Sequence, residues 1–98
     1  MPIIRILDDA AKDLEEGRVF YQKHGVGNYF WDSLLSVIES LLIHSGVHLK
    51  EYGYYRMLAK RFPYAIYYDI RFNFIDIIAV LPIRRNPLWI QAKMSGRR

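Results

Sequence analysis

The sequence contains no cysteine among its 98 residues. A disulfide framework is therefore excluded, and no thiolate is available as a nucleophile or a metal ligand. The chain also lacks an apolar run of the ~20 residues that a membrane-spanning helix requires. Its first residues do not combine a basic stretch with a long apolar one, as a signal peptide would. These absences favour a cytoplasmic protein with no membrane partner.

Low-complexity tracts, internal repeats and linkers are also missing. Hydrophobic residues make up 52% and charged residues 24% of the sequence, which is the composition of a globular protein. We therefore expect one domain over residues 1–98, with disorder confined to a tail from about residue 93.

The charge is unevenly distributed along this basic chain, whose net charge is +4. Residues 1–49 carry four basic and seven acidic side chains, and residues 50–98 carry ten basic and three acidic ones. The second half therefore has a net charge of +7, which indicates an anionic partner, either a nucleic acid or an acidic protein.

The first half contains two helical patterns. Asp8 or Asp9 is expected to cap the first helix, whose apolar stripe includes Ala11, Leu14 and Tyr21. Asn28 is expected to cap the second. Its apolar residues recur at helical spacing: Phe30, Leu34, Val37, Ile38, Leu41 and Leu42. The short link between the two helices predicts an antiparallel hairpin.

The remaining pattern is that of strands. Residues 54–60, 64–70 and 74–81 predict a three-strand meander, and residues 2–7 predict a first strand beside it. The last strand is apolar on both faces apart from Asp76, which indicates a central or doubly covered strand. The order βααβββ predicts an α+β domain with a helical hairpin on one face of a mainly antiparallel four-stranded sheet.

Three stretches of the sequence resemble the RelE/ParE superfamily of toxins from bacterial type II toxin–antitoxin systems. They are "AAKDLEEGRVFY", "RFPYAIYY" and the "AVL" strand that leads into "RRNP". The resemblance covers nearly the whole chain and agrees with the βααβββ order. It implies growth inhibition and a co-encoded antitoxin with an acidic tail, in a system of the plasmid-stabilisation type.

The superfamily has two branches with different targets. ParE-like toxins inhibit DNA gyrase by protein–protein binding, whereas RelE-like toxins are ribosome-dependent mRNA endonucleases. An inactive member that only binds its antitoxin is a third alternative. The resemblance leaves open a homodimer and a toxin–antitoxin heterotetramer.

The ribonuclease alternative requires cations for the phosphate and a group that moves the proton. Cations are present at Arg56, Lys60, Arg61, Arg84 and Arg85. RelE-like relatives place a histidine or tyrosine near the C-terminus, where this chain has neither.

The three histidines, His24, His44 and His48, fall at helix ends or in the following loop, where partners of the helix dipole are more common than catalysts. We therefore favour the ParE-like branch and no enzymatic activity. If the chain is an enzyme, we expect a metal-independent ribonuclease.

Two further groups of side chains have alternative interpretations. Tyr64, Tyr67 and Tyr68 could stack on bases, but amphipathic strand residues whose hydroxyls reach water are the favoured interpretation. Asp69 and Asp76 could form a cation site, but pairing with Arg56 or Arg71 across the sheet is the favoured interpretation. No metal site and no cofactor are expected, since no histidine–carboxylate spacing suits a metal.

The binding site for target and antitoxin is predicted at the end of the last strand. Arg84 and Arg85, with Arg61 and Lys60 on the neighbouring turn, are expected to form a cationic edge. Trp89 follows closely, and arginine with tryptophan is the composition of an interface hot spot. Val19, Phe20 and Trp31 are further candidates for antitoxin docking. Trp31 is the favoured one, with burial in the core as the alternative.

Overall fold

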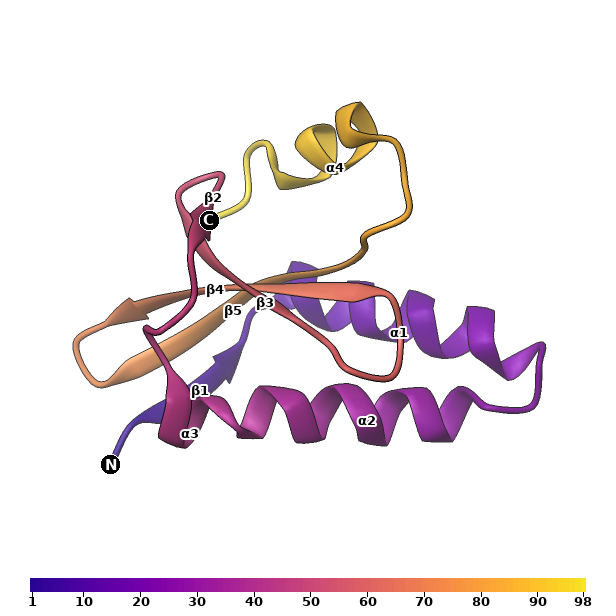
Figure 1. Cartoon of the computed structure of the whole chain (residues 1–98), viewed down its shortest axis with the longest axis horizontal. Coiled ribbons are helices and arrows are strands. Elements are labelled where there is room, and N and C mark those ends of the chain that lie inside the picture. The colour runs from indigo at the N-terminus through magenta and orange to yellow at the C-terminus, as the bar shows by residue number, and fades with distance from the viewer.

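A five-stranded β-sheet lies at the centre of the computed structural model, which describes residues 1–98 (Figure 1). The elements in chain order are β1 (Ile3–Ile6), α1 (Asp8–Gln22), α2 (Gly27–Glu39), α3 (Leu41–His44), β2 (Lys50–Glu51), β3 (Tyr54–Leu58), β4 (Tyr64–Arg71), β5 (Phe74–Pro82) and α4 (Pro87–Met94). The strands lie in the order β1-β5-β4-β3-β2, with β1 parallel to β5 and all other neighbours antiparallel. The predicted α+β architecture and the meander of β3, β4 and β5 are confirmed.

The sheet has one strand more than the four expected. The additional strand, β2, is two residues long and pairs with the start of β3. Tyr52 and Gly53 form the loop between them and have positive φ angles of 57° and 83°, as a type I′ hairpin turn requires. Two residues carry no alternation of apolar and polar side chains, so the sequence pattern could not reveal this strand.

Helices α1 and α2 form the expected hairpin on one face of the sheet (Figure 1). The buried positions of α1 include Ala10, Leu14 and Gly17. The prediction of Ala11 in this stripe is wrong, because the buried face begins one residue earlier. Gly17 allows the two helices to approach closely, since a Cβ atom there would lie 2.4 Å from Cζ of Phe30.

The predicted helix caps are wrong. Leu7 precedes α1 and Val26 precedes α2, and neither helix has a side-chain cap. The first helix begins early because the chain enters it directly from β1. Asp8 and Asp9 therefore lie in its first turn, where their charges still favour the positive end of the helix dipole. Asn28 likewise lies inside α2.

The apolar stripe predicted for the second helix is largely confirmed. Phe30, Leu34, Ile38 and Leu41 are buried, the last of them in the short helix α3 that continues α2. Leu42 lies on the outer side of α3 and is 37% exposed. None of the helices in the structure has both the length and the apolar content needed to cross a membrane.

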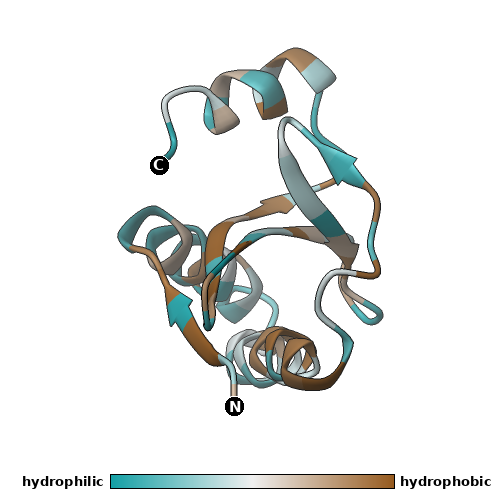
Figure 2. Cartoon of the chain, turned by 90° about the vertical axis from the view of Figure 1, so that its left-hand side faces the viewer, coloured by the Kyte–Doolittle hydropathy of each residue, from teal (hydrophilic) through white to brown (hydrophobic).

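Helix α4 covers the opposite face of the sheet. The view turned by 90° shows α4 on one side of the apolar strands and the α1–α2 hairpin on the other (Figure 2). Ile90 and Met94 of α4 pack with Tyr67, Ile78 and Leu81 of β4 and β5. Strand β5 is thus covered on both faces and flanked by strands on both edges, which confirms its predicted central position.

The three tyrosines of β4 are buried and cannot act as a stacking platform. Tyr64, Tyr67 and Tyr68 are 7%, 1% and 0% exposed, with Tyr67 on the α4 side and the other two on the α1–α2 side. Their hydroxyls were expected to reach water, but the Tyr68 oxygen accepts the Gly46 N–H at 2.9 Å. The Tyr67 oxygen accepts from Nε of Arg56 at 3.2 Å. Coverage of both faces of the sheet explains the difference.

The acidic residues of β4 and β5 do not pair with Arg56 or Arg71 as predicted. Asp76 is fully buried and accepts from Nε of Arg5 at 2.6 Å. The partner is Arg5 because β1 lies beside β5, with the two residues in register. Asp69 accepts the N–H of the next residue at 2.9 Å instead.

The last residues of the chain contact two buried carboxylates. Arg97 forms an ion pair with Asp13 of α1, and Arg98 forms one with Asp76 of β5. The disorder expected from about residue 93 stays a prediction. Formation of these two ion pairs in solution would contradict it.

Candidate functional site

The segment after β5 turns into α4 at Asn86 and Pro87. The Asn86 side chain accepts the N–H of Leu88 at 2.8 Å, and Pro87 occupies the first turn, where its missing N–H costs no hydrogen bond. A short final helix, α4, therefore begins at this point. The local geometry places Trp89 in the first turn of α4, directly after the two arginines.

Arg84, Arg85 and Trp89 form a cationic aromatic surface, which we call the C-terminal surface. The guanidinium carbon of Arg85 lies 4.1 Å from the centre of the Trp89 ring, and Nζ of Lys93 lies 5.6 Å from it. Both arginines are exposed, and neither forms an ion pair. Their charges are therefore available to a partner.

A cavity of about 450 Å³ separates the C-terminal surface from α1. Arg84, Arg85 and Trp89 line one side of it, while Asp13 and Glu16 of α1 contribute carboxylates. Phe20, 53% exposed, also lines this cavity and adds an apolar wall. The C-terminal surface therefore combines cations and a tryptophan with a cavity that has an apolar wall and two carboxylates.

Lys60 and Arg61 were expected to join Arg84 and Arg85 in one cationic edge. The two loops are neighbours, since the N–H of Ile83 donates to the Pro63 oxygen at 2.9 Å. The two pairs of cations nevertheless line different cavities. The structure brings Arg84 and Arg85 together with Trp89 but not with Lys60 and Arg61.

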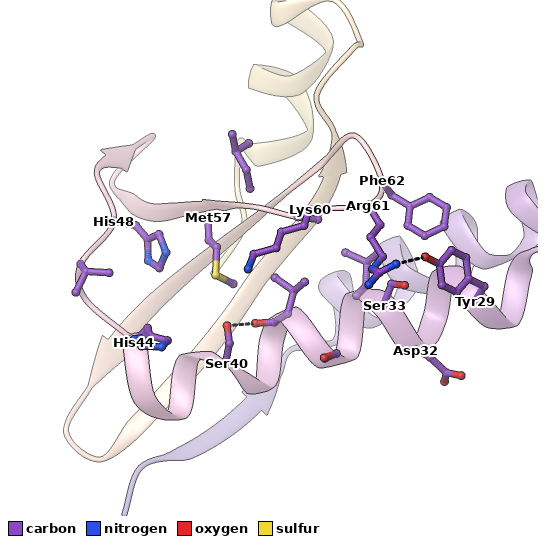
Figure 3. Close-up of a pocket in the computed structure, with 16 residues that line it drawn as sticks. Tyr29, Asp32, Ser33, Ser40, His44, His48, Met57, Lys60, Arg61 and Phe62 are labelled. Carbon is purple, nitrogen blue, oxygen red and sulfur yellow. Dashed lines mark hydrogen bonds between the residues drawn. The ribbon is translucent and has the colours of Figure 1, made fainter.

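Lys60 and Arg61 line a groove of about 880 Å³ between α2 and β3, which we call the α2–β3 groove (Figure 3). Its polar lining residues are Tyr29, Asp32, Ser33, Ser36, Ser40, His44, His48, Lys60 and Arg61. Its apolar lining residues include Val37, Val47, Met57, Leu58 and Phe62. Figure 3 shows the two cations nearer one end of the groove and the two histidines at the other.

The side chains of the groove are only partly held in place. Nη1 of Arg61 donates to the Tyr29 hydroxyl at 2.7 Å (Figure 3), and Lys60 forms no ion pair. Nδ1 of His48 lies 2.5 Å from the Tyr68 hydroxyl in a hydrogen bond, whereas His44 is exposed at the end of α3.

Sequence reasoning placed His44 and His48 among helix-terminal residues and so missed their position in this groove. They are far from Lys60 and Arg61 in sequence, and no local pattern connects the two pairs. Only the packing of α2 against the sheet brings them to one groove.

The proton-transfer capacity of the two surfaces differs. Tyr64, which lines the cavity beside the C-terminal surface, has its pKa raised to about 12 by burial, so its phenol stays protonated near neutral pH. Burial likewise raises the pKa of Tyr68. The α2–β3 groove, by contrast, contains the imidazoles of His44 and His48.

The side chains of two other predicted site residues make contacts within the chain, which leave them only partly exposed. Arg56 is half-buried, donates to the Tyr67 hydroxyl and lies 3.8 Å from a carboxylate oxygen of Glu51. Trp31 is half-buried and packs against the main core. No cluster of three or more metal-ligating side chains is found in the structure.

No protein-family model matches this sequence, and no curated protein does. Among solved structures, a chain from the chromosomal ParDE TA system of P. aeruginosa has a similar fold, with a TM-score of 0.77. The match covers 86% of this chain and 98% of that chain at 14% identity. The fold that the sequence resemblance implied is thus confirmed.

Proposed function

We propose that this chain is the toxin of a type II toxin–antitoxin system, that it inhibits DNA gyrase, and that an antitoxin with an acidic tail neutralises it. The observation that carries the proposal is the fold shared with a chain of the ParDE TA system. The quoted sequence stretches support the same assignment over nearly the whole chain.

The C-terminal surface supports inhibition by protein–protein binding. Arg84 and Arg85 are exposed and unpaired, and Trp89 presents an aromatic ring beside them. Arginine and tryptophan dominate the energetics of many protein interfaces because they combine large contact areas with hydrogen-bond donors. In the proposal, this surface contacts the target.

The charge distribution supports an acidic partner. Residues 50–98 carry a net charge of +7, which would accelerate the encounter with an acidic chain. The proposal places the chain in the cytoplasm, where gyrase is, as a homodimer or in a toxin–antitoxin heterotetramer.

The test follows DNA and protein synthesis by pulse labelling in bacteria directly after induction of the chain. The proposal expects DNA synthesis to fall first, and the purified chain to inhibit supercoiling by gyrase in vitro. The Arg84→Ala/Arg85→Ala variant serves as the matched control. Its induction is expected to leave both DNA synthesis and protein synthesis unchanged. No change in either synthesis for the wild-type chain would favour an inactive member that only binds antitoxin.

A ribosome-dependent ribonuclease is the second candidate, because the α2–β3 groove combines His44 and His48 with Lys60 and Arg61. Imidazoles can move the proton of a 2′-hydroxyl, and the cations can stabilise the phosphate charge. This candidate expects protein synthesis to fall first. It also expects the His44→Ala/His48→Ala variant to lose mRNA cleavage while retaining its fold.

A further inference from the structure

The hydroxyl of Tyr64 has no hydrogen-bond partner within the chain, unlike the hydroxyls of Tyr67 and Tyr68. Tyr64 is only 7% exposed, and its ring lies 5.0 Å from that of Phe30. Every fully buried side-chain polar atom of the structure has a partner. The unpaired hydroxyl therefore faces the cavity between α1 and the C-terminal surface, which Tyr64 lines. A polar group in such a position is rare in a folded protein and calls for an explanation.

The hydroxyl lies on the α1 side of this cavity. A Cβ atom on Gly17 would be 3.2 Å from the Tyr64 oxygen. Burial raises the pKa of Tyr64 to about 12, and the charges of Tyr21, Asp13 and Glu16 act in the same direction. The phenol is therefore protonated near neutral pH and can donate a hydrogen bond to a bound molecule.

Free charges of both signs line the same cavity. The oxygens of Asp13 are held by Arg97 and by a backbone N–H of β5. Glu16, by contrast, is exposed and forms no ion pair, and the same holds for Arg84 and Arg85. One carboxylate and two guanidinium groups are thus available to a ligand.

The remaining walls are mainly aromatic. Phe20, Tyr21 and Trp89 contribute rings, and Pro63 and Pro82 contribute smaller apolar surfaces. The volume of about 450 Å³ lies within the range of roughly 300–1,000 Å³ that is usual for small-molecule sites. Such walls favour a ligand whose body is an aromatic ring.

We propose that this cavity binds a free aromatic amino acid. Its carboxylate accepts hydrogen bonds from Arg84 and the Tyr64 hydroxyl, and its ammonium group donates to Glu16. Its ring packs against Phe20 and Trp89. The inference goes beyond the proposed function and does not depend on it, because the site lies within this chain alone.

A zwitterion accounts for these charges better than a singly charged molecule does. An aromatic acid without an ammonium group leaves Glu16 unpaired beside a like charge. An aromatic amine without a carboxylate leaves Arg84 and the Tyr64 hydroxyl without an acceptor. A nucleotide brings a phosphate of higher negative charge, which Glu16 repels.

The experiment titrates the purified full chain with three probes that share one ring and is followed by heteronuclear NMR. The probes are L-phenylalanine, phenylpropionate, which lacks the ammonium group, and phenethylamine, which lacks the carboxylate. We expect L-phenylalanine to shift the Gly17 amide and the Trp89 indole N–H. The other two probes should bind at least roughly tenfold more weakly, because each loses a charge-assisted contact.

Tyr64→Phe tests the hydroxyl without removing any contact within the chain. It should weaken L-phenylalanine binding roughly tenfold. Its melting temperature should not fall, because the hydroxyl has no partner in the fold. The matched control, Tyr52→Phe, removes a phenol hydroxyl outside the cavity and should bind within about twofold of the wild type.

Glu16→Gln separates the two charged ends of the ligand. It should weaken binding of L-phenylalanine but not of phenylpropionate, because only the first carries an ammonium group. Glu39→Gln, at an exposed and unpaired carboxylate outside the cavity, is its matched control and should change neither affinity.

Three results would overturn the inference. They are no shift at Gly17 and Trp89 with millimolar L-phenylalanine, equal affinity of the wild type for the three probes, and unchanged L-phenylalanine binding by Tyr64→Phe. Each leaves the proposed function intact, since DNA synthesis, protein synthesis and gyrase inhibition are measured without the probes.

Discussion

Arg97 donates hydrogen bonds to both carboxylate oxygens of Asp13, a residue 84 positions earlier in the chain. The two side chains are only 8% and 3% exposed. Asp13 also accepts the N–H of Val80 at 2.9 Å, and Arg97 donates to the Ile78 oxygen at 3.1 Å. The pair thus provides hydrogen-bond partners for backbone groups of β5 beyond the point where β1 ends. It also connects the C-terminal segment to α1.

The first prediction concerns this ion pair. Arg97→Ala should lower the free energy of unfolding by about 3 kcal/mol, because it leaves the Asp13 carboxylate buried without its cation. Urea denaturation measures the loss, and Arg71→Ala, at an exposed and unpaired position, should change stability by less than about 0.5 kcal/mol. Equal stability of wild type and Arg97→Ala would show instead that the tail is disordered in solution.

The second prediction concerns pH. The hydrogen bond from Arg5 lowers the pKa of Asp76 below its ordinary value of 3.8. A carboxylate with a depressed folded-state pKa stabilises the fold above its unfolded pKa, and this contribution is lost as the pH falls through the folded value. The melting temperature should therefore fall steeply below about pH 4.

The Asp76→Asn variant is the matched test of this pH dependence. It should be less stable than the wild type at pH 7, because Arg5 and Arg98 lose their carboxylate partner. Its acid transition should also be shallower, since one of the groups that drive it is gone. An acid transition as steep as that of the wild type would assign the pH dependence to other carboxylates.

The third prediction tests the contact between α1 and α2. Gly17→Ala should destabilise the chain by about 1–3 kcal/mol, because the added Cβ meets the Phe30 ring. Alanine is otherwise the better helix former, so helix propensity alone predicts the opposite sign. In the double variant with Phe30→Leu, the cost of the Gly17 substitution should shrink, which a double-mutant cycle of denaturation midpoints would reveal.

The fourth prediction concerns the C-terminal surface. Arg84→Ala with Arg85→Ala should abolish growth inhibition, because the exposed charges that contact the target are lost. The melting temperature should stay nearly unchanged, since neither side chain forms an ion pair. A large drop in melting temperature would mean that the two arginines stabilise the fold, and growth assays of the variant would then carry no information on binding.

Elements with a strong local pattern were predictable from the sequence. The meander was evident because alternation and β-branched residues mark strands of five residues or more, such as β3, β4 and β5. The stripe from Phe30 to Leu41 was evident because helical spacing repeats over several turns. The two-residue β2 and the starts of α1 and α2 were not, because they depend on one or two residues and on how the chain leaves the preceding element.

The two candidate surfaces also differ in how far the sequence could predict them. Arg85 and Trp89 lie close in sequence, so their proximity could be inferred, and the structure places the guanidinium over the ring. The α2–β3 groove joins His44 and His48 to Lys60 and Arg61 only through the packing of a helix against a strand. No single segment contains that information.

The sequence by itself determined the order of the main elements, the doubly apolar central strand and the concentration of positive charge in the second half. These properties depend on residues that are neighbours along the chain. The tertiary structure alone decided that Arg97 pairs with Asp13, that Asp76 pairs with Arg5, and that Tyr64 lines a cavity together with α1. Each of these depends on which distant segments meet, because a side chain pairs with whatever the packed layers place within its reach.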